Sequence, residues 1–264
     1  MTETFNLSIE QAHAYDELFV PALFAQWVPT LLNYAGVTAG QRVLDVACGT
    51  GVVARQAAEI VGQAGAVTGV DLNPAMLEVA KERASAIRWR VGDAVDLPFA
   101  DNTFDVALCQ SALFFFGDPA RAVKEMARVV RVGGVVALQT YASLAQQPVY
   151  GPFVETVTRL AGDDARKLMG TYWSQGDLGE LRSLVESAGL ATTVADNNLG
   201  HVHFPSIEVF VHTEIQATPL AARIDDATTL EILRETRQAL AEYEQPDGGV
   251  VLPIRACFVA GGKA

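Results

Sequence analysis

Residues 43–51, VLDVACGTG, place one acidic side chain just before a loop of very small residues. The loop contains Gly49 and Gly51, and Asp45 comes four residues before the first of these glycines. A backbone without bulky side chains can be approached closely by another molecule, and a carboxylate can accept hydrogen bonds from cationic or hydroxyl groups. The pattern therefore predicts that a ligand contacts the backbone of this loop.

Two interpretations of the glycine loop follow from the residues themselves. Residues 49–54 match the dinucleotide pattern G-x-G-x-x-A, and Asp71 comes about 20 residues later, which favours a nicotinamide-dependent oxidoreductase. Asp45 before the glycines is not part of that pattern. A Tyr-x-x-x-Lys pair is also missing, because Tyr141 and Tyr150 have no lysine four residues on. The other interpretation uses several further segments of the chain in addition to the glycine loop.

The segments that must position these residues alternate between strand and helix from about residue 35 to 140. Asn73-Pro74 is typical of a helix start, and the apolar period of Val123–Val130 predicts a helix that ends at Gly133-Gly134. Strand–helix repeats with short links predict a parallel sheet covered by helices on both faces. The predicted strands are 42–47, 66–71, 87–92, 104–110 and 134–140.

The flanking regions predict a helical flap and a late cap. Residues 8–36 have a helical pattern with several aromatic residues, so residues 1–35 are interpreted as a flap before a catalytic domain of residues 36–264. The stretch 205–246 is predicted to be a helical cap inserted in that domain. Further elements are predicted as a helix at 177–188 and strands at 190–204 and 250–260.

Composition excludes several classes of partner. The formal net charge of −12 leaves no excess of lysine and arginine to neutralise phosphates, so no nucleic-acid partner is expected. The three cysteines are far apart without metal-ligand spacing, which predicts no metal site and favours the cytoplasm. A secretory signal and an apolar run long enough to span a membrane are both missing from the sequence, so neither export nor a membrane span is expected.

Several segments together resemble one family. DVACGTG, residues 45–51, resembles the D-x-G-x-G-x-G motif of class I S-adenosylmethionine-dependent methyltransferases, with Ala47 in place of the first glycine. GVDLNPAML, VGDAVDLPF, FDVALCQSALFFFGDP and EMARVVRVGGVVAL resemble the later motifs, in the family's order and over about 100 residues. The branch with the greatest similarity contains ubiquinone and menaquinone biosynthesis methyltransferases, which act on small molecules.

This resemblance implies a fold and a cofactor. The fold is α/β: a Rossmann-like, seven-stranded, mostly parallel sheet with helices on both faces, whose last strand, residues 249–263, runs antiparallel. The cofactor is S-adenosyl-L-methionine, and no catalytic residue is shared across the family. The implied cofactor-binding residues are Asp45, Ala47, Gly49, Gly51, Asp71, Leu72, Met76, Asp93, Ala94 and Gln110.

Each implied role matches the chemistry of its residue. The glycine loop would receive the amino-acid end of the cofactor, with Asp45 binding its ammonium group. The two oxygens of Asp71 match two ribose hydroxyls, and Asp93 with the Ala94 N–H would bind the adenine edge. Leu72, like Met76, would form an apolar wall for the ring.

Ordinary structural roles are open for many of these residues. Asp71 could cap a turn, Asp93 could be a loop acid, and Asp45 could order the loop without touching a ligand. Cys48 and Cys109 are interpreted as core residues. Phe114–Phe116 could line a cavity or pack in the core. Lys124 and Arg128, spaced i, i+4, are predicted to face solvent.

The expected reaction is in-line displacement on a sulfonium methyl group by a nucleophile of a small, partly apolar acceptor. Alignment of the reactants and exclusion of water would supply most of the rate, and a base is needed only when the nucleophile must lose a proton. His201 and His203 are weak candidates for that base, since alternation puts both on one face of a strand. A binding protein that keeps the cofactor fold without catalysis is the third alternative.

Overall fold

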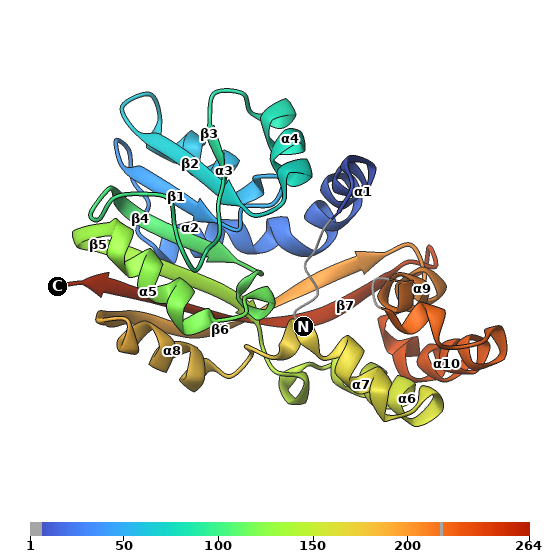
Figure 1. Ribbon diagram of the computed structural model, residues 1–264. Helices are drawn as coiled ribbons and strands as arrows, with labels where there is room; N and C mark the ends of the chain where they lie inside the picture. Colours follow the sequence, from blue (N-terminus) through green and yellow to red (C-terminus); the bar gives the residue numbers. More distant parts are fainter. Residues whose placement is uncertain (1–6, 217–218) are drawn as a thin grey trace. The chain divides into compact units, whose positions relative to one another are not determined.

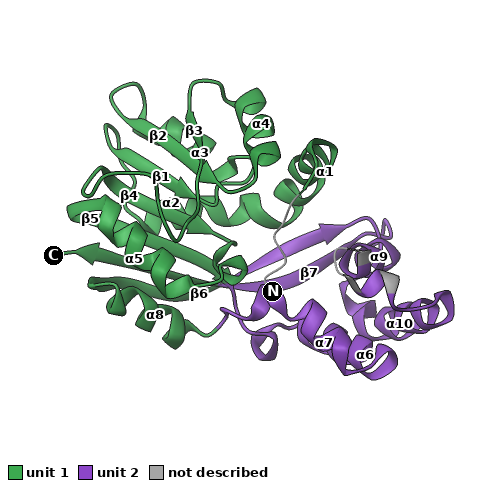
Figure 2. Cartoon of the chain, viewed as in Figure 1, with its two compact units in different colours: residues 1–140, 177–198, 257–264 green, residues 141–176, 199–256 purple. Residues whose placement is uncertain are grey.

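The computed structural model describes residues 7–216 and 219–264 and contains two compact units (Figure 2). Unit 1 comprises residues 1–140, 177–198 and 257–264, and unit 2 comprises residues 141–176 and 199–256. The segment predicted as a flap lies within unit 1. The segment predicted as a cap, 205–246, lies within unit 2, which also contains residues 141–176 and is therefore larger than the sequence pattern indicated.

A seven-stranded sheet organises the chain in the order β3-β2-β1-β4-β5-β7-β6. The pairs of β1 with β2 and β4, of β2 with β3, and of β4 with β5 are all parallel. Figure 1 shows the arrow of β7 opposite to that of β6, so the predicted mixed, mostly parallel α/β sheet is confirmed. The strands are β1 (Arg42–Val46), β2 (Ala66–Asp71), β3 (Arg88–Val91), β4 (Phe104–Gln110), β5 (Val130–Tyr141), β6 (Leu190–Phe204) and β7 (Val250–Lys263).

Several helices of unit 1 begin at side-chain caps that the sequence makes visible. Asn73 accepts a hydrogen bond from the Ala75 N–H at 2.9 Å, and Asp118 and Asp177 cap two later helices in the same way. Right-handed crossovers that leave β1 and β4 in opposite directions put their helices on opposite faces of the sheet. These helices are α3 (Val52–Val61), α4 (Pro74–Arg83), α5 (Pro119–Val129) and α8 (Leu178–Ser187).

The N-terminal segment is helical throughout but changes its winding. Ser8 begins it with a capping box, and the middle part is a ten-residue π-helix, a rare conformation often found at functional sites. Its last helix is fixed in unit 1, where the Tyr34 hydroxyl donates to Asp196 Oδ2 at 2.6 Å and the ring of Trp27 packs against Phe258. Its parts are α1 (Ile9–Ala14), η1 (Tyr15–Phe24), η2 (Ala25–Trp27) and α2 (Val28–Tyr34).

One predicted boundary is wrong. The helix α5 ends at Val129 and β5 begins at Val130, so Gly133-Gly134 lies inside the strand and does not end the helix. The register of β4 and β5 shifts between Phe104 and Val106 at this place. A β-carbon on Gly134 would lie 2.5 Å from the Asp105 carbonyl oxygen, so this glycine permits close approach of two strands.

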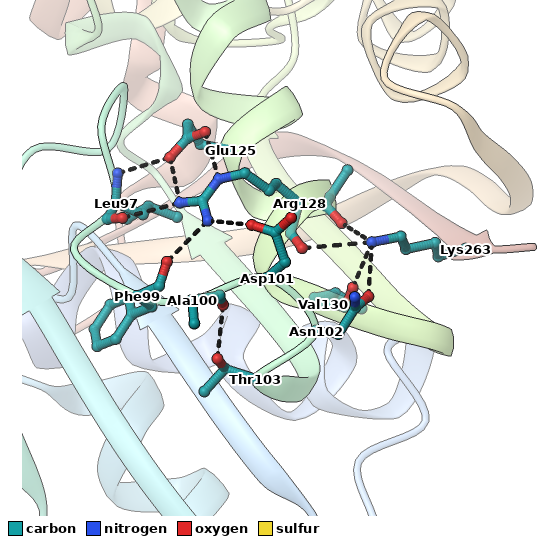
Figure 3. Close-up of polar contacts among 11 residues, drawn as sticks. Leu97, Phe99, Ala100, Asp101, Asn102, Thr103, Glu125, Arg128, Val130 and Lys263 are labelled. Atoms are coloured by element: carbon teal, nitrogen blue, oxygen red, sulfur yellow. Dashed lines mark hydrogen bonds and ion pairs between the residues drawn. The ribbon is translucent and has the colours of Figure 1, made fainter.

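The expectation that Arg128 faces solvent is also wrong. Arg128 on α5 is half-buried and donates to both oxygens of Glu125, to Asp101, and to the carbonyl oxygens of Leu97 and Phe99, at 2.7–3.0 Å (Figure 3). Glu125 in turn accepts the Leu97 N–H at 2.9 Å. This ion pair therefore holds the loop that leads from β3 to β4.

The C-terminal end of β7 is fixed beside the same loop. Lys263 donates to the Ala127 and Val130 carbonyl oxygens at 2.8 and 2.7 Å and to Asn102 Oδ1 at 3.1 Å (Figure 3). With the Arg128 carbonyl oxygen at 3.4 Å, four acceptors around one ammonium group join β7 to the end of α5 and to the turn before β4.

Unit 2 has an aromatic core. The ring of Tyr150 packs against Trp173 and Phe210 with centroids 4.8 and 5.6 Å apart, and its hydroxyl donates to Glu214 at 3.2 Å. Burial raises the pKa of Glu214 to about 7. The helices of this unit are α6 (Tyr150–Ala161), α7 (Asp163–Met169), α9 (Ile207–Gln216) and α10 (Asp226–Leu240).

No helix in the described residues is both long and apolar enough to cross a bilayer.

We predict that Arg128→Met lowers the free energy of unfolding by about 2 kcal/mol, because several charge-assisted hydrogen bonds are lost at a half-buried site. Urea unfolding at neutral pH measures the change. Arg182→Met on α8 is the matched control, since Arg182 makes only an exposed pair with Glu186 four residues on, and should cost about 0.3 kcal/mol. Equal effects of the two substitutions would contradict a structural role for Arg128.

Candidate functional site

The candidate site lies at the carboxyl ends of the central strands. β1 pairs with β2 on one side and β4 on the other, so the chain reverses its direction of winding there, and ligands of open α/β sheets bind at such a point. Asp45 is in register with Gly69 on β2 and Leu108 on β4, so these three residues face the same side of the sheet. Alternation and register add Asp71, Gln110 and Gln139 to that side.

The glycine loop has a backbone that only small residues adopt easily. Gly49 and Gly51 have φ of 53° and 85°, and Ala47 has φ of 54°, an uncommon value for a residue with a side chain. The substitution of alanine for the first glycine of the motif is therefore accommodated at the cost of local strain. Strain of this kind concentrates at functional sites.

The two glycines have different surroundings. A β-carbon on Gly51 would lie 2.3 Å from the ring of Trp89, so Gly51 is required for packing against β3. A β-carbon on Gly49 would meet only the ring of Tyr15, at 3.8 Å. Gly49 is therefore the position whose backbone a ligand can approach most closely, next to Tyr15.

Asp71 links the glycine loop to the end of β2. Its Oδ2 accepts the Gly49 N–H at 2.8 Å, and its Oδ1 accepts the Asn73 N–H at 2.9 Å. Burial raises the pKa of Asp71, and the backbone N–H groups act in the opposite direction. Each carboxylate oxygen has a further lone pair, so these bonds orient the group and leave capacity for two hydroxyls.

Asp45 is buried beneath the loop, with 1% of its surface exposed. Its Oδ2 accepts the Ala54 N–H at 3.0 Å, which orders the first turn of α3. Burial is the main cause that raises the pKa of Asp45 to about 8, and the nearby charge of Asp71 adds to it. Asp45 thus has the structural role that the sequence left open, and contact with a cationic ligand is still a prediction.

The loop after β3 carries the acid predicted to bind adenine. Asp93 is exposed, and its Oδ1 accepts the Val95 N–H at 3.0 Å, whereas Ala94 is buried. Leu72, next to Asp71, is 57% exposed, which is unusual for a leucine beside a polar site and suits a residue that a ligand ring covers. Met76 is buried against α1 instead, together with Ala12 and Val79.

The N-terminal segment is fixed to the same edge of unit 1. Asp16 on η1 is buried and forms ion pairs with Arg83 on α4 at 2.7 Å and with Arg55 on α3 at 3.7 Å. Arg55 also donates to the Thr50 carbonyl oxygen in the glycine loop. The Gln110 amide donates to the Phe24 carbonyl oxygen at 2.8 Å. The flap predicted for residues 1–35 therefore contacts the loop and the end of β4 over its described part.

Sequence reasoning missed several residues of this edge. Tyr15 and Trp89, next to the glycine loop, and Gln139 on β5 belong to no recognised motif. Ser111 lies within a quoted motif but was given no role; it has a left-handed φ of 52°, and its hydroxyl donates to Gln139 Oε1 at 2.6 Å. The polar Gln139 directly after the apolar run of residues 135–138 was the signal that could have indicated this pair.

Cysteines and histidines show no sign of reactivity. Cys48 and Cys109 are buried free thiols, and burial raises the pKa of each, so both stay protonated near neutral pH. Both were predicted as core residues, and their burial agrees with that prediction. His201 and His203 lie on one face of β6, as predicted, and both are exposed.

Together these features define an α/β protein whose sheet edge is built to bind a nucleotide-like cofactor. Residues 44–138 match the model of the family described as "Methyltransferase domain". Residues 44–138 are therefore similar to a methyltransferase domain, and the resemblance to class I S-adenosylmethionine-dependent methyltransferases is confirmed.

Known proteins similar to this chain agree with that assignment. The ubiquinone/menaquinone biosynthesis C-methyltransferase UbiE of Bdellovibrio bacteriovorus is 42% identical over 129 residues, which are 47% of this chain and 54% of that protein. A demethylmenaquinone methyltransferase of Staphylococcus aureus is 40% identical over 133 residues, 48% of this chain and 55% of its own length. The chain spans about half the length of these curated relatives. The crystal structure of YcgJ from Bacillus subtilis has the same fold, with a TM-score of 0.59, 22% identity, and coverage of 90% of this chain and 98% of that one.

We predict that Asp71→Ala weakens S-adenosylmethionine binding at least about tenfold, or about 1.4 kcal/mol, because the ribose hydroxyls lose their acceptor and the loop loses its bond to β2. Calorimetric titration measures the affinity, and circular dichroism checks that the variant is folded. Glu59→Ala, which removes an exposed carboxylate from α3, should bind like wild type. Wild-type affinity of the Asp71 variant would remove this residue from the cofactor site.

We predict that Asp45→Asn makes stability less dependent on pH. The pKa of Asp45 is about 8 in the folded protein and 3.8 as a free side chain, so the folded state binds more protons between these values. The free energy of unfolding of the wild type therefore falls as pH rises, by up to about 1.4 kcal/mol per pH unit. Asparagine still accepts the Ala54 N–H but does not ionise.

Chemical unfolding of wild type and variant between about pH 5 and pH 8 tests this prediction. The control is Asp225→Asn at an exposed helix cap, where the pKa of the aspartate is lowered and no change of slope is expected in that range. Parallel pH profiles of wild type and the Asp45 variant would show that Asp45 is ionised throughout.

Proposed function

We propose that this chain transfers a methyl group from S-adenosyl-L-methionine to a small-molecule acceptor. The observation that carries the proposal is the Gly49–Asp71 arrangement, in which one carboxylate fixes a left-handed glycine loop and still has two oxygens for a ribose. The match of residues 44–138 to the methyltransferase domain family supports it. Because the curated relatives extend beyond their matched halves, the activity of the whole chain is our inference.

The residues present fit this cofactor. Asp71 offers two acceptor oxygens, Asp93 offers an exposed carboxylate after β3, and the side chain of Leu72 is exposed. The N–H groups of Gly49, Gly51 and Ala54 are already bonded within the protein. The carboxylate of the cofactor must therefore use other donors around this turn. Asp45 beneath the loop would bind the ammonium group.

The cofactor supplies an activated methyl group on a positively charged sulfur. The protein has two tasks: to hold the acceptor nucleophile in line with that methyl group, and to exclude water. The N-terminal segment serves the second task in this proposal, because Tyr15 covers Gly49 and Phe24 accepts the bond from Gln110. Such covering segments commonly open and close during turnover.

The acceptor class we propose is a neutral, partly apolar small molecule, such as a quinone precursor. This follows the printed names of the relatives, which are methyltransferases of ubiquinone, menaquinone and demethylmenaquinone. We also propose the cytoplasm as its compartment, because all three cysteines are free thiols.

Incubation with radiolabelled S-adenosylmethionine and a panel of naphthoquinols, phenols and amines tests the activity. We predict label transfer to an oxygenated ring compound, and thermal stabilisation by S-adenosylhomocysteine but not by NADH, worth about 2.7 kcal/mol at 100 times the dissociation constant. Asp71→Ala serves as the inactive control. Stabilisation by NADH alone would favour an oxidoreductase, and cofactor binding without transfer to any member of the panel would favour a binding protein.

The same assay decides whether a histidine removes a proton. His201→Ala and His203→Ala should each keep turnover within a few-fold of wild type, because both side chains are exposed. A base would lose about 100-fold or more, with the affinity for the cofactor unchanged. Such a loss in either variant would establish that histidine as the base.

A further inference from the structure

Two buried polar atoms at the carboxyl ends of β4 and β5 have no hydrogen-bond partner among the described residues. They are Oε1 of Gln110 and Nε2 of Gln139, in side chains that are 9% and 1% exposed. A buried polar group without a partner costs about 1–3 kcal/mol, and folded proteins contain few of them. Two such groups side by side therefore indicate that a partner outside the chain completes them.

The register places the two glutamines on adjacent strands. Gln110 and Gln139 are Cα partners across the parallel pair of β4 and β5, so their side chains lie on the same face, one strand apart. The opposite end of each amide is fixed. Gln110 Nε2 donates to Phe24, and Gln139 Oε1 accepts from Ser111, so neither side chain is free to turn toward another partner.

The backbone at this place is also strained. Ser111, directly after Gln110, is one of three described residues other than glycine with a left-handed φ, and its N–H donates to the Gln139 carbonyl oxygen at 2.9 Å. This conformation turns the chain sharply after β4 and brings the serine hydroxyl to the amide of Gln139. Residues held in such strain concentrate at functional sites.

From this arrangement we propose that Gln110 and Gln139 bind the hydroxyl group of a neutral aromatic methyl acceptor, an assignment that rests on the proposed function. A hydroxyl can donate to Gln110 Oε1 and accept from Gln139 Nε2 at the same time. The orientation of both amides supports this pairing, because Gln110 Nε2 donates to the Phe24 carbonyl oxygen and Gln139 Oε1 accepts from Ser111.

The surroundings favour a neutral ring over an ion. Leu113 and Phe114 after Ser111 are buried, and Phe115 and Phe116 are half-buried, so the turn that follows is apolar and aromatic. An anionic acceptor would need a lysine or arginine and a cationic acceptor a carboxylate, whereas the two side chains with unpaired atoms here are amides. A phenol or quinol matches both the polar pair and the aromatic turn.

Four probes of the same ring size test the proposal: 2-naphthol, naphthalene, 2-naphthoate and 2-naphthylmethylammonium. Equilibrium dialysis with the full chain, with and without S-adenosylhomocysteine, measures their affinities. We expect 2-naphthol to bind at least about tenfold more tightly than the other three. Equal affinity of 2-naphthol and naphthalene, or a preference for either ion, would overturn the proposal.

Variants locate the effect. Gln139→Met and Gln110→Met keep the chain length of the side chain but remove the amide, and each should reduce the preference for 2-naphthol over naphthalene about tenfold. Gln147→Met is the matched control, because the Gln147 amide is buried and fully bonded to Ala142 and Arg255 within unit 2. It should lower Tm and leave the preference unchanged. An unchanged preference in both folded variants would overturn the assignment.

The outcome is separable from that of the proposed function. Binding of S-adenosylhomocysteine without a preference for 2-naphthol would contradict the glutamine site and leave the methyltransferase proposal standing. A preference for 2-naphthol that both substitutions remove, without any binding of the cofactor, would support the glutamine site and contradict the proposed reaction.

Discussion

The hydrogen bond from the Gly49 N–H to Asp71 is the contact on which the rest of the site depends. It joins the loop after β1 to the end of β2, two places that are 22 residues apart in sequence and adjacent only because the strands are parallel. The same carboxylate holds the start of α4 through Asn73. One side chain therefore sets the position of the loop and of the first turn of the next helix, and its two oxygens are the ones that we propose for a ribose. A site that must recognise a ribose needs this preorganisation, because a carboxylate that moved freely would lose affinity to the entropy of ordering it.

Asp45 and Asp71 both lie at the glycine loop, and their charges determine the electrostatics there. Burial raises the pKa of both Asp45 and Asp71, and the charge of Asp71 raises the pKa of Asp45 further. Part of the compensation comes from Arg55, which reaches the loop carbonyl of Thr50 and the buried Asp16 of the N-terminal segment. A cationic ligand would supply the remainder. The charges around the glycine loop thus favour a molecule with a positive charge at the loop and hydroxyl groups beside Asp71. S-adenosylmethionine has both features.

The sequence was sufficient to predict elements that are determined by the residues within them. Apolar, β-rich runs predicted the five strands of the core and Asn73-Pro74 predicted a helix start, whereas the roles of the acids after these strands were implied by the family resemblance. The sequence was insufficient to predict the role of a residue whose partners lie far away in the chain or on another element. The spacing of Arg128 from Lys124 indicates that both lie on one face of a helix. The helical periodicity of the sequence cannot show that Glu125, Asp101 and two carbonyl oxygens lie beside Arg128. Trp89 is a similar case, because only the pairing of β3 with β2 brings its ring against Gly51. The helices at 150–169 were missed because their apolar residues pack within unit 2, whose members are separated in the sequence by residues 177–198.

The strained residues show how the two halves of the site are related. Ala47 follows β1 and Ser111 follows β4, the two strands between which the sheet reverses its winding, and each has a left-handed φ near 50°. In both places the chain turns sharply at the end of the strand. Beside Ala47 the polar groups are carboxylates, which suit a cation and sugar hydroxyls. Beside Ser111 they are amides, which suit a neutral oxygen. Since β1 and β4 are hydrogen-bonded neighbours, the two kinds of group stand one strand apart along a single edge. A reaction that joins a charged methyl donor to an uncharged acceptor requires this adjacency, and the strain at both turns is the structural cost of providing it.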